Sequence, residues 1–173
     1  MERVKGTNLA EEMPNGHATL YASPTGALHS CQLSENVQRF VDAFNQLDHT
    51  NLAPADEIYH REVQFQDPAH KIKGIDALKS YLAGMYEEVL SCEFHVHQEV
   101  SQENESFISW TMQLSHTKLN QGQMLCVEGA SCLKFADNKV IYHRDYFDLG
   151  AMLYEHIPLL GRVVRYIKQK LGQ

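Results

Sequence analysis

One acidic side chain stands at the end of a strand-like segment, where it could act as a base. Residues 62–74 read EVQFQDPAHKIKG, and Val63, Phe65 and Asp67 alternate with polar residues, which is the two-residue period of a strand. Pro68 ends the strand, because proline has no N–H to donate to a neighbour. A carboxylate on the inward face would have a raised pKa and accept a proton near neutral pH. The alternative is that Asp67 caps the turn before Pro68.

Two histidines come nearest to a metal-binding pair. His95 and His97 are two residues apart in a strand-like segment, so their side chains share a face, together with Glu93 and Glu99. A solvated polar surface explains this set better than a metal site. The four cysteines form no CxxC pair and show no zinc spacing. We therefore expect no metal, and we expect most of the cysteines to be buried, reduced thiols.

The composition bounds the class of protein. The chain has 173 residues, 43% of them hydrophobic and 21% charged, which suits one globular domain plus a tail. The formal net charge of -7 argues against a general nucleic-acid binder, which needs a basic face. The sequence shows neither an apolar signal-peptide core near its start nor an apolar run of about 20 residues. We therefore expect a cytoplasmic protein.

The first half of the chain carries helical periodicity. Residues 1–32 lack periodicity and are predicted to form a flexible arm. Ser34 is the expected N-cap of a helix, a shorter helix is expected at residues 52–60, and another begins at Ile75. The apolar stripes of the first and third helices are Val37, Phe40, Val41, Phe44 and Leu47, and Ile75, Leu78, Leu82, Met85 and Val89.

The second half reads as a meander of long strands. Three groups share a face by the period of two: Phe94, Val96, Gln98 and Val100; Ile108, Trp110, Met112 and Leu114; Val127, Gly129, Ser131, Leu133 and Phe135. Asp137-Asn138 predicts a tight hairpin turn, and residues 140–148 form the last strand. Helices followed by strands predict an α+β domain at residues 33–148. A cone-shaped, curved antiparallel or mixed sheet with helices on its concave face would enclose a pocket.

Residues 149–173 form a predicted amphipathic helical extension, interrupted at Pro158 and Gly161. Its apolar stripe and its basic residues are Val163, Val164, Ile167 and Leu171, and Arg162, Arg165, Lys168 and Lys170. One placement folds the extension over the pocket, closing it with Met152, Leu153, Ile157, Leu159 and Leu160. The other lays it on an anionic membrane. Because the rest of the protein is acidic, we favour packing against the protein.

Four segments are similar to a known superfamily. They are ENVQRFVDAFNQLD (35–48), VQFQDP (63–68), VEGASCLKFADNKV (127–140) and HRDYFD (143–148). Together they resemble the SnoaL-like branch of the nuclear-transport-factor-two-like superfamily, over about residues 34–148. That superfamily includes ketosteroid isomerases, SnoaL-type polyketide cyclases, limonene epoxide hydrolases and scytalone dehydratases, and also proteins without catalytic activity.

Residue by residue, the resemblance to ketosteroid isomerases is partial. Asp67 matches the isomerase base, an Asp before Pro on this strand. The oxyanion-hole tyrosine falls on Phe40, which has no hydroxyl, and the protonated oxyanion-hole aspartate falls on Ser131, a weaker donor. Steroid isomerisation depends on donors to the developing enolate. We therefore predict that this protein does not catalyse it.

The last strand carries the other expected site residues. In register with the isomerases, Ile141, His143, Asp145 and Phe147 face the interior of the cone, and Asp145 resembles an acid that SnoaL-type cyclases carry on a late strand. Asp67 would be the base, Asp145 a second acid or base and His143 its partner, while Ser131 would donate to the substrate oxygen. The remaining predicted wall consists of Phe40, Phe44, Trp110, Met112 and Phe147.

These expectations define two classes of function. The first is a small-molecule pocket protein that binds an apolar, carbonyl-type ligand. If it is catalytic, it is a cofactor-independent isomerase, cyclase or dehydratase. The second is a non-catalytic binding or dimerisation scaffold, in which His143 only satisfies Asp145 and either placement of the tail, on the protein or on lipid, remains open. Tyr142 and Tyr146 on the outer sheet face predict a homodimer in either case.

Overall fold

Local sequence signals set the first three helices. The computed structural model describes residues 33–157 and 159–171, so the predicted arm at residues 1–32, Cys31 and Pro158 lie outside the described residues. The helices are α1 (Glu35–Phe44), α2 (Ala53–Ile58) and α3 (Ile75–Tyr86). Ser34 caps α1 as predicted, because its Oγ accepts a hydrogen bond from the Val37 N–H at 3.4 Å. Gly74 precedes α3 with a φ of 85°, which glycine adopts without the steric penalty of a Cβ.

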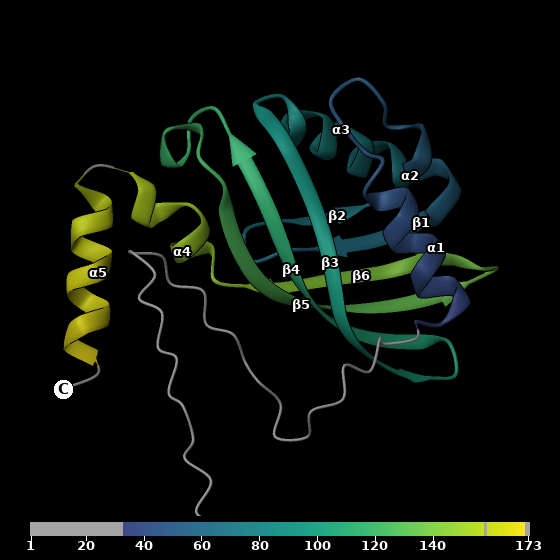
Figure 1. The fold of residues 1–173 in the computed structure, drawn as a ribbon. Coiled ribbons are helices and arrows are strands. Elements are labelled where there is room, and N and C mark those ends of the chain that lie inside the picture. The colour runs from purple at the N-terminus through teal and green to yellow at the C-terminus, as the bar shows by residue number, and fades with distance from the viewer. Residues whose placement is uncertain (1–32, 158, 172–173) are drawn as a thin grey trace, which may run out of the picture. The chain divides into compact units, whose positions relative to one another are not determined.

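One six-stranded sheet forms the framework of the fold. Its strands are β1 (Tyr59–Gln66), β2 (Lys71–Lys73), β3 (Val89–Gln102), β4 (Glu105–His116), β5 (Leu125–Ala136) and β6 (Lys139–Phe147). They lie in the order β2-β1-β6-β5-β4-β3, and only β1 and β6 pair in parallel. Figure 1 shows that the sheet curves and stays open, with β2 and β3 at its edges. The predicted α+β class with a curved mixed sheet is confirmed.

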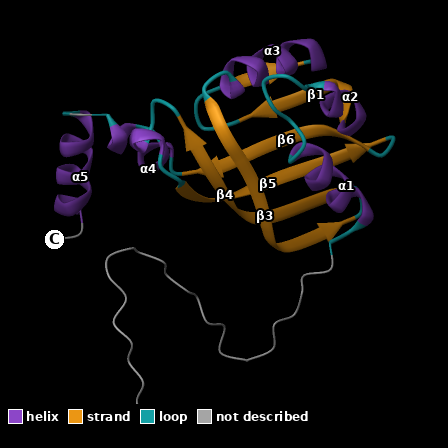
Figure 2. Ribbon diagram, turned by 45° about the horizontal axis from the view of Figure 1, so that its top comes forward, coloured by secondary structure: helices purple, strands orange, loops and turns teal. Residues whose placement is uncertain are grey.

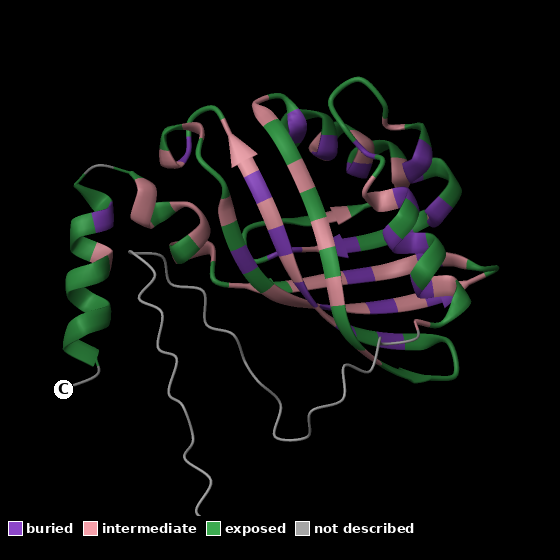
Figure 3. Ribbon diagram, in the orientation of Figure 1, coloured by how far each residue is buried: buried purple, intermediate pink, exposed green. Residues whose placement is uncertain are grey.

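The core lies between the sheet and the helices. Figure 2 shows α1, α2 and α3 gathered on one side of the sheet, and Figure 3 shows buried residues where these helices meet the strands. On α3 the buried residues are Leu78, Leu82 and Tyr86. The predicted stripe was wrong beyond Leu82, because Met85 is 45% exposed and Val89 already belongs to β3.

The β5–β6 hairpin follows its turn residues. Asp137 and Asn138 have φ values of 50° and 59°, which matches a two-residue turn with positive φ at both central positions. The predicted phase of β5 is also confirmed, since Val127, Ser131, Leu133 and Phe135 are buried. Ser131 is therefore held on the helix-covered face, opposite Asp145 on β6.

A bulge at His97 changes the phase of β3. Val96 pairs with Trp110 and Glu99 with Ile108, so three residue steps on β3 match two on β4. The prediction that Gln98 and Val100 share the face of Phe94 was therefore wrong: Val100 is 74% exposed. Glu99 instead accepts hydrogen bonds from the Ser34 N–H and Oγ, both at 2.7 Å. The bulge thus joins β3 to the start of α1.

The C-terminal extension contains α4 (Leu149–Met152), the 3₁₀ helix η2 (Tyr154–His156) and α5 (Leu160–Leu171). Gly161 was predicted to interrupt the extension, but it lies inside α5. There it is buried against Glu155, because an added Cβ would lie 2.2 Å from the Glu155 carbonyl oxygen. Among residues 33–157 and 159–171, no helix combines the length and apolarity needed to span a membrane.

Aromatic side chains on the last strand interact with neighbouring basic side chains. The Arg144 guanidinium lies 4.6 Å from the ring centre of Tyr146, and the Lys134 ammonium lies 5.9 Å from that of Tyr142. Such contacts are typical of cation–π pairs. Tyr146 is still 43% exposed, and the homodimer expected through this face stays a prediction.

Candidate functional site

A small cavity lies between α1 and the central strands. Its volume is about 20 Å³, which holds about one water molecule. α1, β3, β4, β5 and β6 all contribute side chains to its wall. The lining residues are Phe40, Val41, Phe44, Phe94, Val96, Ile108, Trp110, Ser131, His143 and Asp145.

Most of the predicted pocket residues meet at this cavity, and three do not. Asp67, Met112 and Phe147 are absent from its lining. Met112 is buried in the core, and the Phe147 ring lies 6.2 Å from that of Trp110, centre to centre. Asp67 lies at the end of β1, where the strand turns towards β2. The two carboxylates expected in one cavity are therefore not both in its wall.

The polar residues of the cavity form a hydrogen-bonded chain. Tyr59 Oη lies 2.8 Å from His143 Nδ1, and His143 Nε2 lies 2.8 Å from Asp145 Oδ1. Ser131 Oγ donates to the same Asp145 oxygen at 2.5 Å. Trp110 Nε1 donates to Ser131 Oγ at 2.8 Å. These hydrogen bonds therefore converge on the Asp145 carboxylate from both sides of the site.

The direction of these hydrogen bonds follows from Tyr59. Its burial, with a further contribution from the charge of Asp145, raises the pKa of the Tyr59 hydroxyl well above the usual value. The hydroxyl is therefore protonated, and because His143 Nδ1 is its one hydrogen-bond partner among the described residues, it donates to Nδ1. In this tautomer His143 carries its ring proton on Nε2 and donates it to Asp145 Oδ1. Ser131 was predicted to donate to a substrate, but its hydroxyl proton is directed to Asp145 instead.

The second oxygen of Asp145 is available to a ligand. Oδ1 accepts from Ser131 and His143, while no described residue donates to Oδ2. Within residues 33–157 and 159–171, no fully buried side-chain polar atom lacks a partner. Because the Asp145 side chain is 16% exposed and lines the cavity, Oδ2 is accessible. One oxygen is thus held in place and the other can accept a proton.

Tyr59→Phe tests whether this hydroxyl positions His143. The substitution leaves Nδ1 without its donor in a site where His143 is 2% exposed, so we expect the free energy of unfolding to fall by about 1 to 3 kcal/mol. Urea unfolding measures this change, and ¹⁵N NMR reports the imidazole tautomer. Tyr154→Phe, which removes an exposed hydroxyl, is the matched control. An unchanged tautomer in Tyr59→Phe would contradict the positioning role.

Tyr59 was missed by the sequence analysis. It was placed in a helix over residues 52–60, whereas α2 ends at Ile58 and Tyr59 begins β1. Counting back from Val63 and Phe65 in steps of two does reach Tyr59. However, the pairing of β1 with β6 is irregular between Tyr59 and Gln64, so the alternation of buried residues is lost there.

Asp67 caps a turn, as the alternative interpretation stated. Its Oδ1 accepts hydrogen bonds from the backbone N–H of Ala69 at 2.7 Å and of His70 at 2.6 Å, and its Oδ2 accepts one from the Tyr81 hydroxyl. Burial alone would raise the pKa of Asp67, but the bonds from Tyr81, Ala69 and His70 outweigh it and lower the pKa. The expected raised pKa was therefore wrong, since these donors stabilise the charged form.

Asp67→Ala should change the acid dependence of stability. A carboxyl with a lowered folded-state pKa stabilises the fold above its unfolded pKa of about 3.9, and this contribution is lost as pH falls through the folded pKa. We expect the variant to be about 1 to 2 kcal/mol less stable at neutral pH, with the difference shrinking below about pH 4. Urea unfolding at both pH values measures it. Glu57→Ala in α2 is the control, and a pH-independent difference would contradict the assignment.

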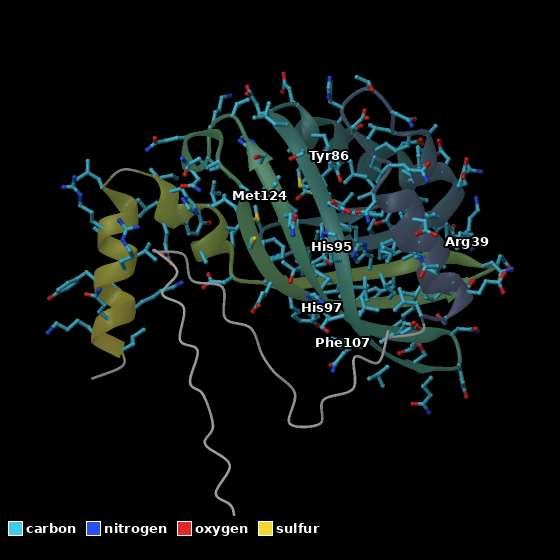
Figure 4. The ribbon with its side chains drawn as sticks, viewed as in Figure 1. Arg39, Tyr86, His95, His97, Phe107 and Met124 are labelled. Carbon is cyan, nitrogen blue, oxygen red and sulfur yellow. The ribbon has the colours of Figure 1, made fainter. Side chains whose placement is uncertain are left out.

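The histidine pair lies on the surface of the edge strand (Figure 4). His95 Nε2 lies 3.7 Å from Glu93 Oε2, and His97 Nε2 lies 2.7 Å from Thr111 Oγ1. Glu99 was expected on this face and is not, because of the bulge at His97. The described part of the chain contains no group of three or more His, Cys, Asp or Glu side chains placed to hold a metal ion.

The described cysteines are free thiols. Burial raises the pKa of the Cys92 thiol to about 12, so it stays protonated and is a poor nucleophile. Cys92 and Cys132 are half-buried, whereas Cys126 is exposed, so none of the three described cysteines is fully buried as expected. Cys126 and Cys132 lie at different positions along β5 and do not meet.

The sequence is similar to a known protein family. The sequence matches the SnoaL-like domain family over residues 37–143. No curated protein matches it.

Solved structures share the fold at low sequence identity. A protein from Jannaschia described as a SnoaL-like polyketide cyclase is 18% identical, with a TM-score of 0.58, over 68% of this chain and 88% of that chain. A nuclear transport factor 2-like protein from Burkholderia pseudomallei is 13% identical, with a TM-score of 0.60, over 70% and 96%. A Catenulispora acidiphila protein with a ketosteroid isomerase-like fold, in complex with trimethylamine, is 12% identical, with a TM-score of 0.60, over 69% and 89%.

Proposed function

The chain belongs to the SnoaL-like domain family, and we propose that its cavity binds an apolar carbonyl compound from which Asp145 removes a proton at carbon. One observation carries this proposal: Asp145 lines the cavity, its Oδ1 is held by Ser131 and His143, and no described residue donates to its Oδ2. An oriented carboxylate in a mostly apolar site is suited to act as a general base. The likeness to a protein described as a SnoaL-like polyketide cyclase is consistent with this chemistry.

The donors of the cavity narrow the class of substrate. Three lining side chains carry polar hydrogens: Ser131, His143 and Trp110. Each already donates its hydrogen to another side chain of the site. The other lining side chains, apart from the base Asp145, are apolar. The site therefore lacks a free donor for a developing enolate oxygen. The substrate must delocalise its own negative charge, as a 1,3-dicarbonyl does, or a ketone that carries an aryl group on its acidic carbon.

Binding such a ligand requires the cavity to widen. Its volume of about 20 Å³ is far below the roughly 300 to 1,000 Å³ of a pocket for a drug-sized molecule. Phe44 and Phe94 are half-buried lining residues whose rings pack 5.1 Å apart, centre to centre. Beside them, Asn45 exchanges hydrogen bonds with the Phe94 backbone at 3.0 and 2.8 Å. Rotation of these rings enlarges the cavity without breaking the α1–β3 connection.

The narrow cavity also favours a second candidate function. A site that holds about one water molecule and whose polar hydrogens are all used within the protein suits a non-catalytic scaffold. In that case the hydrogen bonds that link Tyr59, His143 and Asp145 serve only to satisfy buried polar groups. The two candidates differ in whether an aromatic ketone enters the cavity.

Deuterium exchange on two isomeric ketones tests the proposal. The carbanion of 2-tetralone at C1 is delocalised over both the carbonyl and the aromatic ring, whereas that of 1-tetralone has only the carbonyl. We expect the protein to accelerate exchange at C1 of 2-tetralone in D₂O and to leave 1-tetralone at the buffer rate. Trp110 is the single tryptophan of the chain and lines the cavity, so its fluorescence reports binding. If neither ketone changes the fluorescence or exchanges faster, the scaffold is the correct assignment.

A further inference from the structure

α5 contacts the protein through its polar side. Lys168 Nζ lies 2.7 Å from both Asp148 Oδ2 and Glu155 Oε1, and Arg165 Nη1 donates to the Glu155 carbonyl at 2.9 Å. Gly161 packs on the same segment. Residues 161, 165 and 168 recur at the spacing of one helix face. Charged and polar contacts thus set the orientation of α5. An amphipathic sequence normally indicates that the apolar face of a helix packs against the protein, which is the opposite orientation.

The apolar row of α5 is consequently exposed. Leu160, Val163, Ile167 and Leu171 share another face of the helix, and they are 41%, 52%, 51% and 83% exposed. The predicted stripe included Val164, which is half-buried, but the expectation that it packs against the protein was wrong for Val163, Ile167 and Leu171. None of the residues expected to close the pocket lines the cavity. Of the 14 large apolar side chains that are exposed among the described residues, 8 lie between Tyr154 and Leu171, so this surface is concentrated in the extension.

Two basic side chains lie beside the apolar row. Arg162, Tyr166 and Lys170 follow one another at four-residue spacing, next to Val163 and Ile167. Arg162 and Lys170 form no ion pair with any described residue, and the Lys170 ammonium lies 6.0 Å from the Tyr166 ring centre. α5 contains no acidic residue. Its exposed side therefore combines an apolar row with uncompensated positive charge and an aromatic hydroxyl.

We propose that α5 docks this protein on an anionic lipid surface. The apolar row would lie at the boundary between head groups and acyl chains, as in helices that lie in the membrane interface. Arg162 and Lys170 would extend their aliphatic stems along it and place their charges near the head-group phosphates. Tyr166 between them suits the interface, where tyrosine is enriched. This proposal is independent of the function assigned to the cavity.

Charge favours lipid over a second copy of this helix. Two α5 helices packed through the apolar row would bring their Arg162 and Lys170 side chains together, with no acidic residue on α5 to offset them. The net charge of the whole chain, -7, opposes approach to an anionic membrane. That repulsion is screened beyond about 8 Å at physiological ionic strength, whereas the two bases act at contact.

Vesicle sedimentation of the full chain tests the proposal. The probes are vesicles of phosphatidylcholine alone and of phosphatidylcholine mixed with phosphatidylglycerol. We expect measurable, weak partitioning to the mixed vesicles only. It should weaken when ionic strength rises from about 0.1 M to about 1 M, which shortens the Debye length from about 10 Å to about 3 Å.

Paired variants separate the two components of binding. Arg162→Gln/Lys170→Gln should lower the partition coefficient roughly thirtyfold, since each base near the surface contributes about fivefold. Val163→Gln/Ile167→Gln should lower it about tenfold or more, because partly buried apolar area is lost. The charge control is Lys71→Gln/Lys73→Gln on β2, which removes two exposed bases. The apolar control is Leu90→Gln/Val100→Gln on β3, and both controls should bind as the unchanged protein does.

Three results would overturn this assignment. The first is absence of sedimentation with phosphatidylglycerol vesicles, and the second is an equal loss of binding in the control variants. The third comes from light scattering after size exclusion: an oligomer that Val163→Gln/Ile167→Gln dissociates would identify a second copy as the occupant. Thermal unfolding of every variant verifies that the domain is folded, so a loss of binding refers to the α5 surface.

Discussion

In Asp145→Asn, we expect the rate of proton exchange on 2-tetralone to fall by about 10² to 10⁴-fold, the usual contribution of a general base. Asparagine keeps the shape of the side chain, and its carbonyl oxygen can still accept the hydrogen bonds that Ser131 and His143 direct to Oδ1. Its NH₂ group then replaces Oδ2, the oxygen to which no described residue donates. The variant therefore removes the proton acceptor while leaving the wall of the cavity in place.

The matched control for this experiment is Asp67→Asn. It makes the same chemical change at the other carboxylate once expected in the pocket, which is directed to a turn instead. We expect Asp67→Asn to keep the exchange rate, and we expect Asp145→Asn to keep the change in Trp110 fluorescence on binding. If Asp67→Asn lost activity while Asp145→Asn kept it, the base would be Asp67 and the assignment made from this geometry would be wrong.

Gly129→Ala should strongly destabilise the protein, because Gly129 lies against Trp110 of the cavity wall. Gly129 pairs directly with Trp110 across β4 and β5, and an added Cβ would lie 2.3 Å from the Trp110 ring. That ring is 3% exposed and tied to Ser131 through its Nε1, so it has little room to move. We expect a loss of about 3 kcal/mol in the free energy of unfolding and a red shift of the Trp110 emission as the indole is displaced.

A second glycine provides the comparison for this experiment. An alanine Cβ at Gly84, in α3, meets nothing within 4 Å, so Gly84→Ala should stabilise the protein by up to about 1 kcal/mol. Urea unfolding of both variants separates steric overlap from the general effect of replacing glycine. Trp110→Phe should recover part of the loss in a double-mutant cycle, because the smaller ring leaves room for the added methyl. A Gly129→Ala protein as stable as the unchanged one would show that the indole can move.

The sequence alone determined the features that depend on neighbours within a few residues. Ser34 caps α1 because a side-chain oxygen reaches the N–H three residues on, and Asp137-Asn138 turns the chain because both residues tolerate positive φ. The phase of β5, and with it the inward position of Ser131, follows from an uninterrupted alternation. The resemblance to SnoaL-like proteins added the inward position of His143 and Asp145, which line the cavity.

Only the tertiary structure decided which carboxylate faces the cavity, where β3 changes phase and which side of α5 meets the protein. The hydroxyl of Tyr81, fourteen residues further along the chain, is one of the donors that lower the pKa of Asp67. The periodicity of the sequence does not reveal such a contact. The bulge at His97 is a property of pairing between β3 and β4, so counting along one strand misses it. Ion pairs to Asp148 and Glu155 orient α5, although its apolar pattern alone predicts the opposite face, because amphipathicity identifies a helix side and not the partner that covers it.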